Sequence, residues 1–236
     1  MRKFRFSVLL TVLIILLSLT LNQLDLLPKS KIVTAKPTEN QTIIIDAGHG
    51  GFDGGAVAND GTVEKDINLD IALMLGNMLS LNGIEVIYTR KSDIGTETTN
   101  SSIIHSKKKS DLKNRLQLMR DYPNSVFVSI HLNKFTTSSA QGAQVFYSGN
   151  HESAKLLAES IQKSIVKSIQ PDNKRTVKKG AKDTYLLFNA YVPAVIVECG
   201  FLSNNNELEK LKNKDYQAKI AFCVFSGIND FYIFKE

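Results

Sequence analysis

Residues 43–51 read IIIDAGHGG, and this stretch decides how the rest of the chain is interpreted. Three β-branched apolar residues followed by a turn of small residues are typical of a short buried strand that ends in a tight loop. Glycines stand on both sides of His49, so the backbone at this histidine can come close to a ligand. If His49 has a chemical role, other reactive side chains should lie at the ends of neighbouring strands.

The composition is that of an ordinary globular protein. The chain has 236 residues, of which 43% are hydrophobic and 22% are charged, enough for one α/β domain and a tail. The net charge of +6 suits anionic partners such as nucleic acid, lipid headgroups or wall polymers. Arg2, Lys3 and Arg5 supply half of that charge, and no RNA-binding or zinc-finger pattern is present. We therefore expect no nucleic-acid partner, and we expect the basic run 107–109 to be a solvated loop.

The two cysteines are too few for a disulfide framework. Cys199 lies in an apolar run, and Cys223 lies in an apolar helical pattern. We expect both to be small buried thiols. The sequence offers neither a Ser-His-Asp order nor a Cys-His pair for nucleophilic catalysis.

The N-terminus predicts a domain that works outside the cytoplasm. Residues 6–24 carry no charge and are long enough to span a bilayer as a helix. The basic residues before them predict a cytoplasmic N-terminus with the rest of the chain outside. A cleavable signal peptide is the alternative, but no small-residue cleavage motif follows the apolar run directly. We expect an anchor or signal segment over 1–24 and a polar, Pro-containing linker over 25–40.

From residue 41 onward, strands and helices are expected to alternate. The predicted strands are 42–48, 84–90, 125–131, 142–148, 193–201 and a possible short one at 183–188. The predicted helices are 64–83, 111–122, 152–169 and 215–232, with a long polar loop over 91–110. This alternation predicts a single-domain layered α/β fold over 41–236, with a mixed, largely parallel sheet flanked by helices.

Chemically capable side chains stand near the ends of three predicted strands. His49 follows the first strand, His131 ends the strand 125–131, and Glu198 lies near the end of the last strand, while Glu64 opens the first helix. Ligands of open α/β sheets bind at the carboxyl ends of the strands, so these groups can converge. Two imidazoles and one carboxylate leave one position of Zn²⁺ open, which is typical of catalytic zinc. A second carboxylate could take a proton from water, so the pattern predicts a mononuclear metal hydrolase.

Each of these residues also has a purely structural explanation. His49 could be a loop residue, Glu64 could be a first-turn carboxylate favoured by the helix dipole, and His131 could be a satisfied polar residue. Glu198 is harder to explain, because an acidic residue in a buried strand is costly without a partner. The loop fits neither glycine-rich phosphate-binding motif, so no nucleotide site is expected. Two further histidines are expected at the surface: His105 and His151.

Four motifs resemble those of the zinc-dependent N-acetylmuramoyl-L-alanine amidases of the type-3 amidase fold. They are DAGHGGFDGGAV (46–57), VEKDINLDIALML (63–75), VFVSIHLN (126–133) and VPAVIVECGFLSN (192–204), and the resemblance runs from about residue 42 to 232. It implies that His49, Glu64 and His131 bind zinc and that Glu198 is the catalytic carboxylate. The implied reaction is hydrolysis of the amide between the lactyl group of N-acetylmuramic acid and L-alanine in peptidoglycan.

The chain also resembles the spore-cortex, CwlD-type branch of this family. That branch has one amidase domain behind a short hydrophobic segment, and the stretch 105–118 (HSKKKSDLKNRLQL) is similar to it as well. The resemblance implies a role in forming muramic-δ-lactam, together with a deacetylase, in the cortex that germination enzymes recognise. It implies a location at the cortex side of the forespore membrane, with membrane contact through the N-terminal segment.

The implied mechanism assigns the proton transfers to Glu198, which activates water and then protonates the departing alanine nitrogen. Asn133 and Arg115 are candidates for contacting the substrate or supporting the site, and a surface ion pair is the alternative for Arg115. Two other functions stay open: a zinc peptidase acting within the stem peptide, and a catalytically silent wall-binding protein. A monomer is the default expectation, and no sequence feature identifies an activating partner protein.

Overall fold

A computed structural model describes residues 41–99 and 101–235 of the chain. The predicted N-terminal segment (1–24) and linker (25–40) lie outside these residues. Within the described part, no helix has both the length and the apolar character needed to cross a membrane.

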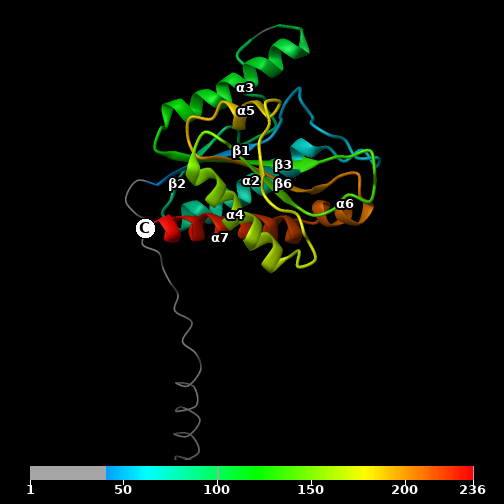
Figure 1. Cartoon of the computed structure of the whole chain (residues 1–236). Coiled ribbons are helices and arrows are strands. Elements are labelled where there is room, and N and C mark those ends of the chain that lie inside the picture. Colours follow the sequence, from blue (N-terminus) through cyan, green and yellow to red (C-terminus); the bar gives the residue numbers. More distant parts are fainter. Residues whose placement is uncertain (1–40, 100, 236) are drawn as a thin grey trace, which may run out of the picture. The chain divides into compact units, whose positions relative to one another are not determined.

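A six-stranded sheet in the order β2-β1-β3-β6-β4-β5 forms the centre of the fold (Figure 1). The strands are β1 (Thr42–Ala47), β2 (Glu85–Tyr88), β3 (Ser125–Asn133), β4 (Gln144–Tyr147), β5 (Lys178–Lys179) and β6 (Ala194–Phe201). All neighbouring pairs are parallel except β4 with β6. The predicted mixed, largely parallel sheet is therefore confirmed.

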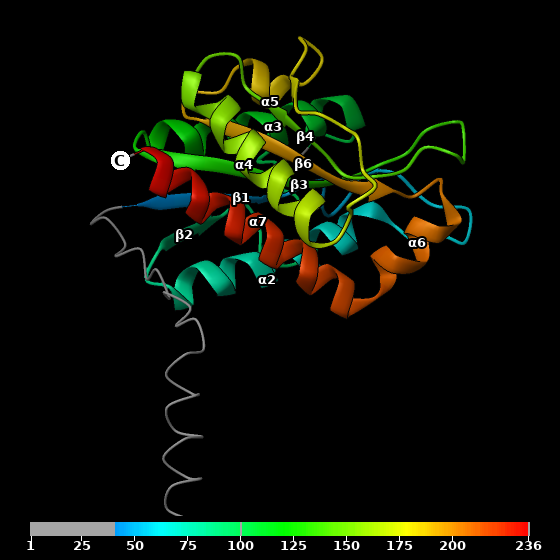
Figure 2. The same ribbon diagram turned by 60° about the horizontal axis from the view of Figure 1, so that its bottom comes forward.

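Helices cover both faces of the sheet, as Figures 1 and 2 show. They are α2 (Glu64–Leu81), α3 (Ile104–Asp121), α4 (Glu152–Ser168), α5 (Tyr185–Phe188), α6 (Asn205–Lys212) and α7 (Lys214–Lys235). Ile43 and Ile45 of β1 pack in one core cluster with Leu75 of α2, whereas Ile44 packs in a second cluster with Leu116 of α3. Because successive strand residues point to opposite faces, the run of three isoleucines is buried on both sides.

A polar loop was predicted over residues 91–110, and this is wrong for its last seven residues, 104–110. Helix α3 begins at Ile104, so the basic run 107–109 is helical and not a loop. The stretch has no apolar periodicity, but lysine is a good helix former and an exposed helix end needs no buried stripe. The helix is held to the sheet by side chains nearer its C-terminus, including Leu116 and Met119.

Residues 183–188 do not form the predicted strand. They include the short helix α5, in which Leu186 and Leu187 are both buried against the same cluster. Two successive side chains on one face fit a helical turn and not a strand, where they would point to opposite faces. Helix α6 was not predicted, although Asn204 caps it by accepting from the backbone N–H groups of Asn206 and Glu207.

Candidate metal centre

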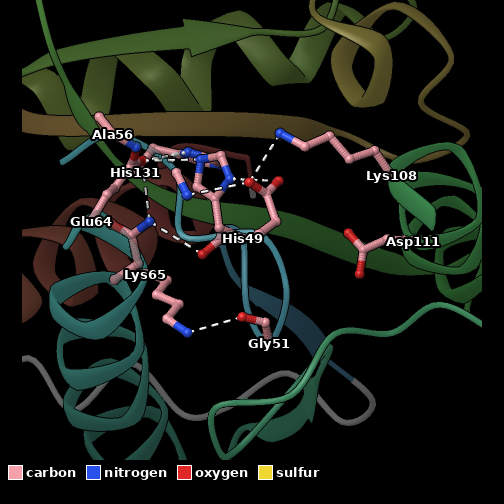
Figure 3. A network of polar contacts seen from close by, with 12 residues as sticks. His49, Gly51, Ala56, Glu64, Lys65, Lys108, Asp111 and His131 are labelled. Carbon is pink, nitrogen blue, oxygen red and sulfur yellow. Dashed lines mark hydrogen bonds and ion pairs between the residues drawn. The ribbon is translucent and has the colours of Figure 1, made fainter. Parts of the chain in front are cut away.

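Three of the predicted reactive side chains meet at the carboxyl edge of β1 and β3. His49 follows β1, Glu64 is the first residue of α2, and His131 lies near the end of β3. One ligand atom from each of the three lies within 4.8 Å of the others. Glu64 Oε1 lies 3.4 Å from His49 Nε2 and 3.0 Å from His131 Nδ1 (Figure 3). The structure therefore brings together the three residues that the sequence suggested as metal ligands.

Glycines make this approach possible, and this explains why His49 stands among them. A Cβ atom at Gly48 would lie 2.3 Å from His131 Nε2, and one at Gly55 would lie 2.6 Å from Glu64 Oε2. Both distances are shorter than any side-chain contact allows. His49 itself adopts a left-handed φ of 62°, which is uncommon for a residue other than glycine. The loop is thus shaped around the three side chains.

The electrostatics of the cluster favour a bound cation. Burial raises the pKa of Glu64, but hydrogen bonds with His131 and His49 outweigh burial and hold that pKa far below its usual range. Burial lowers the pKa of His49, but hydrogen bonds to Asp53 and Glu64 outweigh it and raise the pKa to about 9. The carboxylate is therefore ionised between two imidazoles, and a metal ion could replace the imidazole protons that face it.

Glu198 faces the same cluster from the neighbouring strand. It is the register partner of His131 in the parallel pair β3–β6. Its Oε2 atom is buried and has no hydrogen-bond partner among the residues that the structure describes. Burial, aided by the charge of Glu64, raises the pKa of Glu198 to about 7 although His131 opposes the shift. A carboxyl group that titrates near neutrality can both accept and donate a proton.

Arg115 is buried beneath the loop 48–55, which carries His49 and is called the metal loop below, and it is not a surface residue. Its side chain is 2% exposed and forms ion pairs with Asp46 and Asp111. Its Nη1 donates to the carbonyl oxygen of Ala47 at 3.0 Å, and its Nη2 donates to that of His49 at 2.7 Å. The guanidinium thus holds the backbone carbonyl groups of Ala47 and His49 in place. The alternative that the sequence left open for Arg115, an ion pair at the surface, is wrong because both ion pairs are buried.

Asn133 occupies a different environment. It is the last residue of β3, where the register with β6 shifts. Its carbonyl oxygen accepts from the backbone N–H of Leu202 at 2.8 Å, while its side chain makes no hydrogen bond within the described part of the chain. A substrate contact for this residue stays a prediction.

The sequence analysis missed two polar residues that contact the candidate ligands. Asn68 is buried and donates to Glu64 Oε1 and to the carbonyl oxygen of Gly48, both at 3.2 Å. Asp53 Oδ2 lies 3.0 Å from His49 Nδ1. Both residues lie four positions after the ligand that they contact. On a helix this spacing places Asn68 beside Glu64 and could have been recognised, whereas Asp53 depends on the conformation of the loop.

The buried thiols were predicted correctly. Cys199 and Cys223 are both 1% exposed and unpaired. Cys199 therefore offers no accessible nucleophile to the site beside it.

Comparison with known families identifies the family to which this fold belongs. The family profile described as N-acetylmuramoyl-L-alanine amidase (Amidase_3) matches residues 43–230. The chain belongs to the N-acetylmuramoyl-L-alanine amidase family. The match includes all four reactive residues discussed above, and the predicted class of enzyme is confirmed.

Individual amidases show the same relationship. The germination-specific N-acetylmuramoyl-L-alanine amidase of Bacillus subtilis (strain 168) is 32% identical over 199 residues, which cover 84% of this chain and 83% of the relative. The structure of the CwlD amidase from Clostridioides difficile in complex with the GerS lipoprotein is 41% identical, with a TM-score of 0.79. That match covers 83% of this chain and 100% of the CwlD chain.

A further solved amidase, from Clostridium difficile 630, is 31% identical to this chain, with a TM-score of 0.71. The match covers 83% of this chain and 98% of the solved amidase chain. These similarities confirm the predicted resemblance to the CwlD-type amidases. They also agree with a single α/β amidase domain, since the aligned part of this chain spans almost the whole of each solved relative.

Proposed function

We propose that this amidase is zinc-dependent and hydrolyses the bond between the lactyl group of N-acetylmuramic acid and L-alanine in peptidoglycan. The observation that carries the zinc assignment is the cluster of His49, Glu64 and His131. Two imidazoles and one carboxylate form a donor set that suits catalytic zinc and leaves a position open. When bound, the ion would act as a Lewis acid on the amide carbonyl and lower the pKa of a water molecule.

Glu198 would carry the protons of the reaction. Its carboxylate takes a proton from the attacking water while the new bond from oxygen to the lactyl carbonyl carbon forms. It then gives that proton to the alanine nitrogen as the carbon–nitrogen bond breaks. A pKa of about 7 suits both steps, because the group can change its protonation state at neutral pH.

Arg115 would act by positioning, and Asn133 would contact substrate at the edge of the site. The buried guanidinium of Arg115 reaches the carbonyl oxygens of Ala47 and His49, and its contacts therefore support a role in holding the metal loop. Asn133 follows two residues after His131 and is partly exposed, a position from which its amide can reach a ligand at the site.

We extend the proposal to modification of the spore cortex during the formation of muramic-δ-lactam, a step needed for germination. Similarity to an amidase named as germination-specific and to a CwlD amidase supports this role. Because that CwlD was solved with a lipoprotein, we propose that this chain also has a protein partner. The domain would work outside the cytoplasm, either anchored through residues 1–24 or secreted.

Mass spectrometry of muropeptides tests the proposed reaction. The full-length protein, loaded with zinc, is incubated with purified peptidoglycan, and a chelator-treated sample and His131→Ala serve as controls. We expect peptide-free glycan fragments and free stem peptides that begin at L-alanine, in the zinc-loaded wild-type sample alone.

Two other results would contradict the proposal. Shortened stem peptides still attached to muramic acid would show a peptidase. Unchanged muropeptides with a zinc-loaded protein, when its proposed protein partner is also present, would favour a silent wall-binding protein. The complete set of reactive residues at the site makes the second result unexpected.

A further inference from the structure

We propose that Asp53 is a positioning residue for the metal ligand His49, and that Lys108 of helix α3 holds Asp53 in place. The inference rests on the proposed zinc site. It assigns roles to a carboxylate and a lysine that are not themselves metal ligands.

The carboxylate of Asp53 connects the histidine to helix α3. Its Oδ2 atom lies 3.0 Å from His49 Nδ1, and its Oδ1 atom lies 3.0 Å from Lys108 Nζ. Figure 3 shows Lys108 extending from α3 toward the loop of His49. The backbone N–H of Gly55 also donates to Oδ1, at 3.3 Å. Both oxygens are therefore engaged, although the side chain is still 19% exposed.

The backbone around Asp53 is fixed as well. Its N–H donates to the carbonyl oxygen of Gly50 at 3.0 Å, and its own carbonyl oxygen accepts from the N–H of Gly50 at 2.8 Å. This reciprocal pair closes a tight turn directly after His49. The carboxylate is consequently held at a defined place relative to the imidazole ring.

This contact determines which ring nitrogen is available to a metal. His49 points Nε2 at Glu64 and Nδ1 at Asp53. If Nδ1–H donates to the carboxylate, the lone pair of Nε2 is free for coordination and the ring becomes a more basic ligand. A carboxylate that orients a metal-binding histidine in this way typically contributes about 10–100-fold to metal affinity.

Lys108 makes helix α3 part of the metal site. One helical turn after Lys108, Asp111 binds Arg115, whose Nη2 donates to the carbonyl oxygen of His49 at 2.7 Å. The same helix therefore acts on the imidazole of His49 through Asp53 and on its backbone through Arg115. The Lys108 side chain is 50% exposed, so its contribution should be smaller than that of Asp53.

Zinc affinity of purified full-length variants, measured by competition with a chromophoric chelator, tests the proposal. We expect about 10-fold weaker binding for Asp53→Asn and up to about 100-fold weaker binding for Asp53→Ala. Lys108→Gln should weaken binding by about two- to five-fold, as expected for a partly exposed ion pair.

Two conservative variants serve as matched controls. Asp60 lies in the same segment as Asp53, but its carboxylate pairs with Lys212 and touches no candidate ligand. Lys109 follows Lys108 on α3 and is exposed. Asp60→Asn and Lys109→Gln should bind zinc as the wild type does.

Thermal unfolding of the zinc-free proteins separates positioning from a general role in folding. We expect Lys108→Gln to unfold at the wild-type temperature and Asp53→Asn to unfold only slightly below it, because Asp53→Asn keeps a hydrogen-bonding side chain beside His49 and loses only the charge. These two variants therefore remain informative if Asp53→Ala fails to fold. Wild-type zinc affinity in Asp53→Asn would overturn the proposal, and wild-type affinity in Lys108→Gln would overturn the role of Lys108. A loss of affinity that is matched by loss of zinc-free stability would also overturn it. A wild-type protein that binds no zinc would instead contradict the proposed zinc site.

Discussion

The Oε2 atom of Glu198 is buried and has no hydrogen-bond partner among the described residues. Burying a carboxylate oxygen without a hydrogen-bond partner normally costs free energy. Because no neighbour occupies this oxygen, it is available to accept and donate a proton. The register pairing with His131 places it beside the candidate metal ligands without making it one of them. Metal binding and hydrolysis should therefore be separable at this residue.

We expect Glu198→Gln to bind zinc normally but to hydrolyse peptidoglycan about 10²–10⁴-fold more slowly, because the amide cannot transfer the proton. Zinc stoichiometry and muropeptide release, measured on the same preparation, check this. Glu159→Gln, which changes a half-exposed carboxylate paired with Lys155, is the matched control. Wild-type turnover by the zinc-loaded Glu198→Gln protein would remove Glu198 from the mechanism.

Gly55→Ala should disrupt the metal centre, because its Cβ would meet Glu64 Oε2 and His49 Cδ2 at 2.6 Å. Gly61→Ala is a suitable control. Gly61 also has a positive φ, of 89°, but an added Cβ meets no atom within 4 Å. Both changes should cost roughly 1–3 kcal/mol in backbone strain, whereas only Gly55→Ala should lose zinc binding. Equal zinc affinities in the two variants would show that the space at Gly55 is not needed.

Helix α3 is connected to the central sheet through a buried ion pair as well as through apolar contacts. Arg115 of α3 pairs with Asp46 at the end of β1. Burial raises the pKa of Asp46, but the charge of Arg115 and hydrogen bonds from Ser129 and Thr89 outweigh burial and lower it. A carboxylate whose pKa is lower in the folded than in the unfolded state stabilises the fold above its unfolded pKa.

That stabilisation should be lost as the pH falls below about 4, toward and through the lowered pKa of Asp46. Asp46→Asn should lower the free energy of unfolding by about 1–3 kcal/mol at neutral pH, since it removes one of the two carboxylates that pair with Arg115 and leaves Asp111 in place. The free energy of unfolding of this variant should also fall less on acidification. Urea unfolding of the zinc-free protein between pH 2 and pH 7 measures both effects. Asp172→Asn, at an exposed position, is the control, and an identical acid dependence in wild type and Asp46→Asn would contradict the prediction.

The elements with strong apolar periodicity were the ones best predicted from the sequence. The three isoleucines 43–45 indicated a buried strand, and the apolar stripe after Glu64 indicated α2 with its correct first residue. The start of α3 was missed because its first turns are polar and exposed. For this reason Lys108 was placed in a loop, and its contact with Asp53 could not be foreseen.

The ends of parallel strands share one edge of a sheet, which placed His49, His131 and Glu198 together from the sequence. The division into three metal ligands and one catalytic carboxylate came from the resemblance to the amidases. What periodicity did not provide was the path of the loop 48–55. The left-handed φ of His49 and the turn between Gly50 and Asp53 arise from local hydrogen bonds and close packing. The buried role of Arg115 likewise required the distance from α3 to β1, which no spacing along the chain reveals.

At the scale of the whole molecule, the cluster links metal binding to stability. His49, Glu64 and His131 lie close together only in the folded chain, so zinc should favour the folded state. At a free zinc concentration about 100 times the dissociation constant, we expect the Tm to rise by roughly 5–10 °C. Differential scanning fluorimetry with and without a chelator measures this, and His131→Ala, in which the effect should vanish, is the control. An equal rise in both proteins would indicate zinc binding elsewhere.

The arrangement of the sheet also has a consequence for biosynthesis. Glu64 and His131 are separated by 67 positions in the chain, and Glu198 is carried by β6, the last strand to be made. An emerging polypeptide therefore holds only scattered donors and has no proton-transfer group until most of the domain has been synthesised and paired. Amidase activity should thus begin only after β6 has been made and has paired with β3.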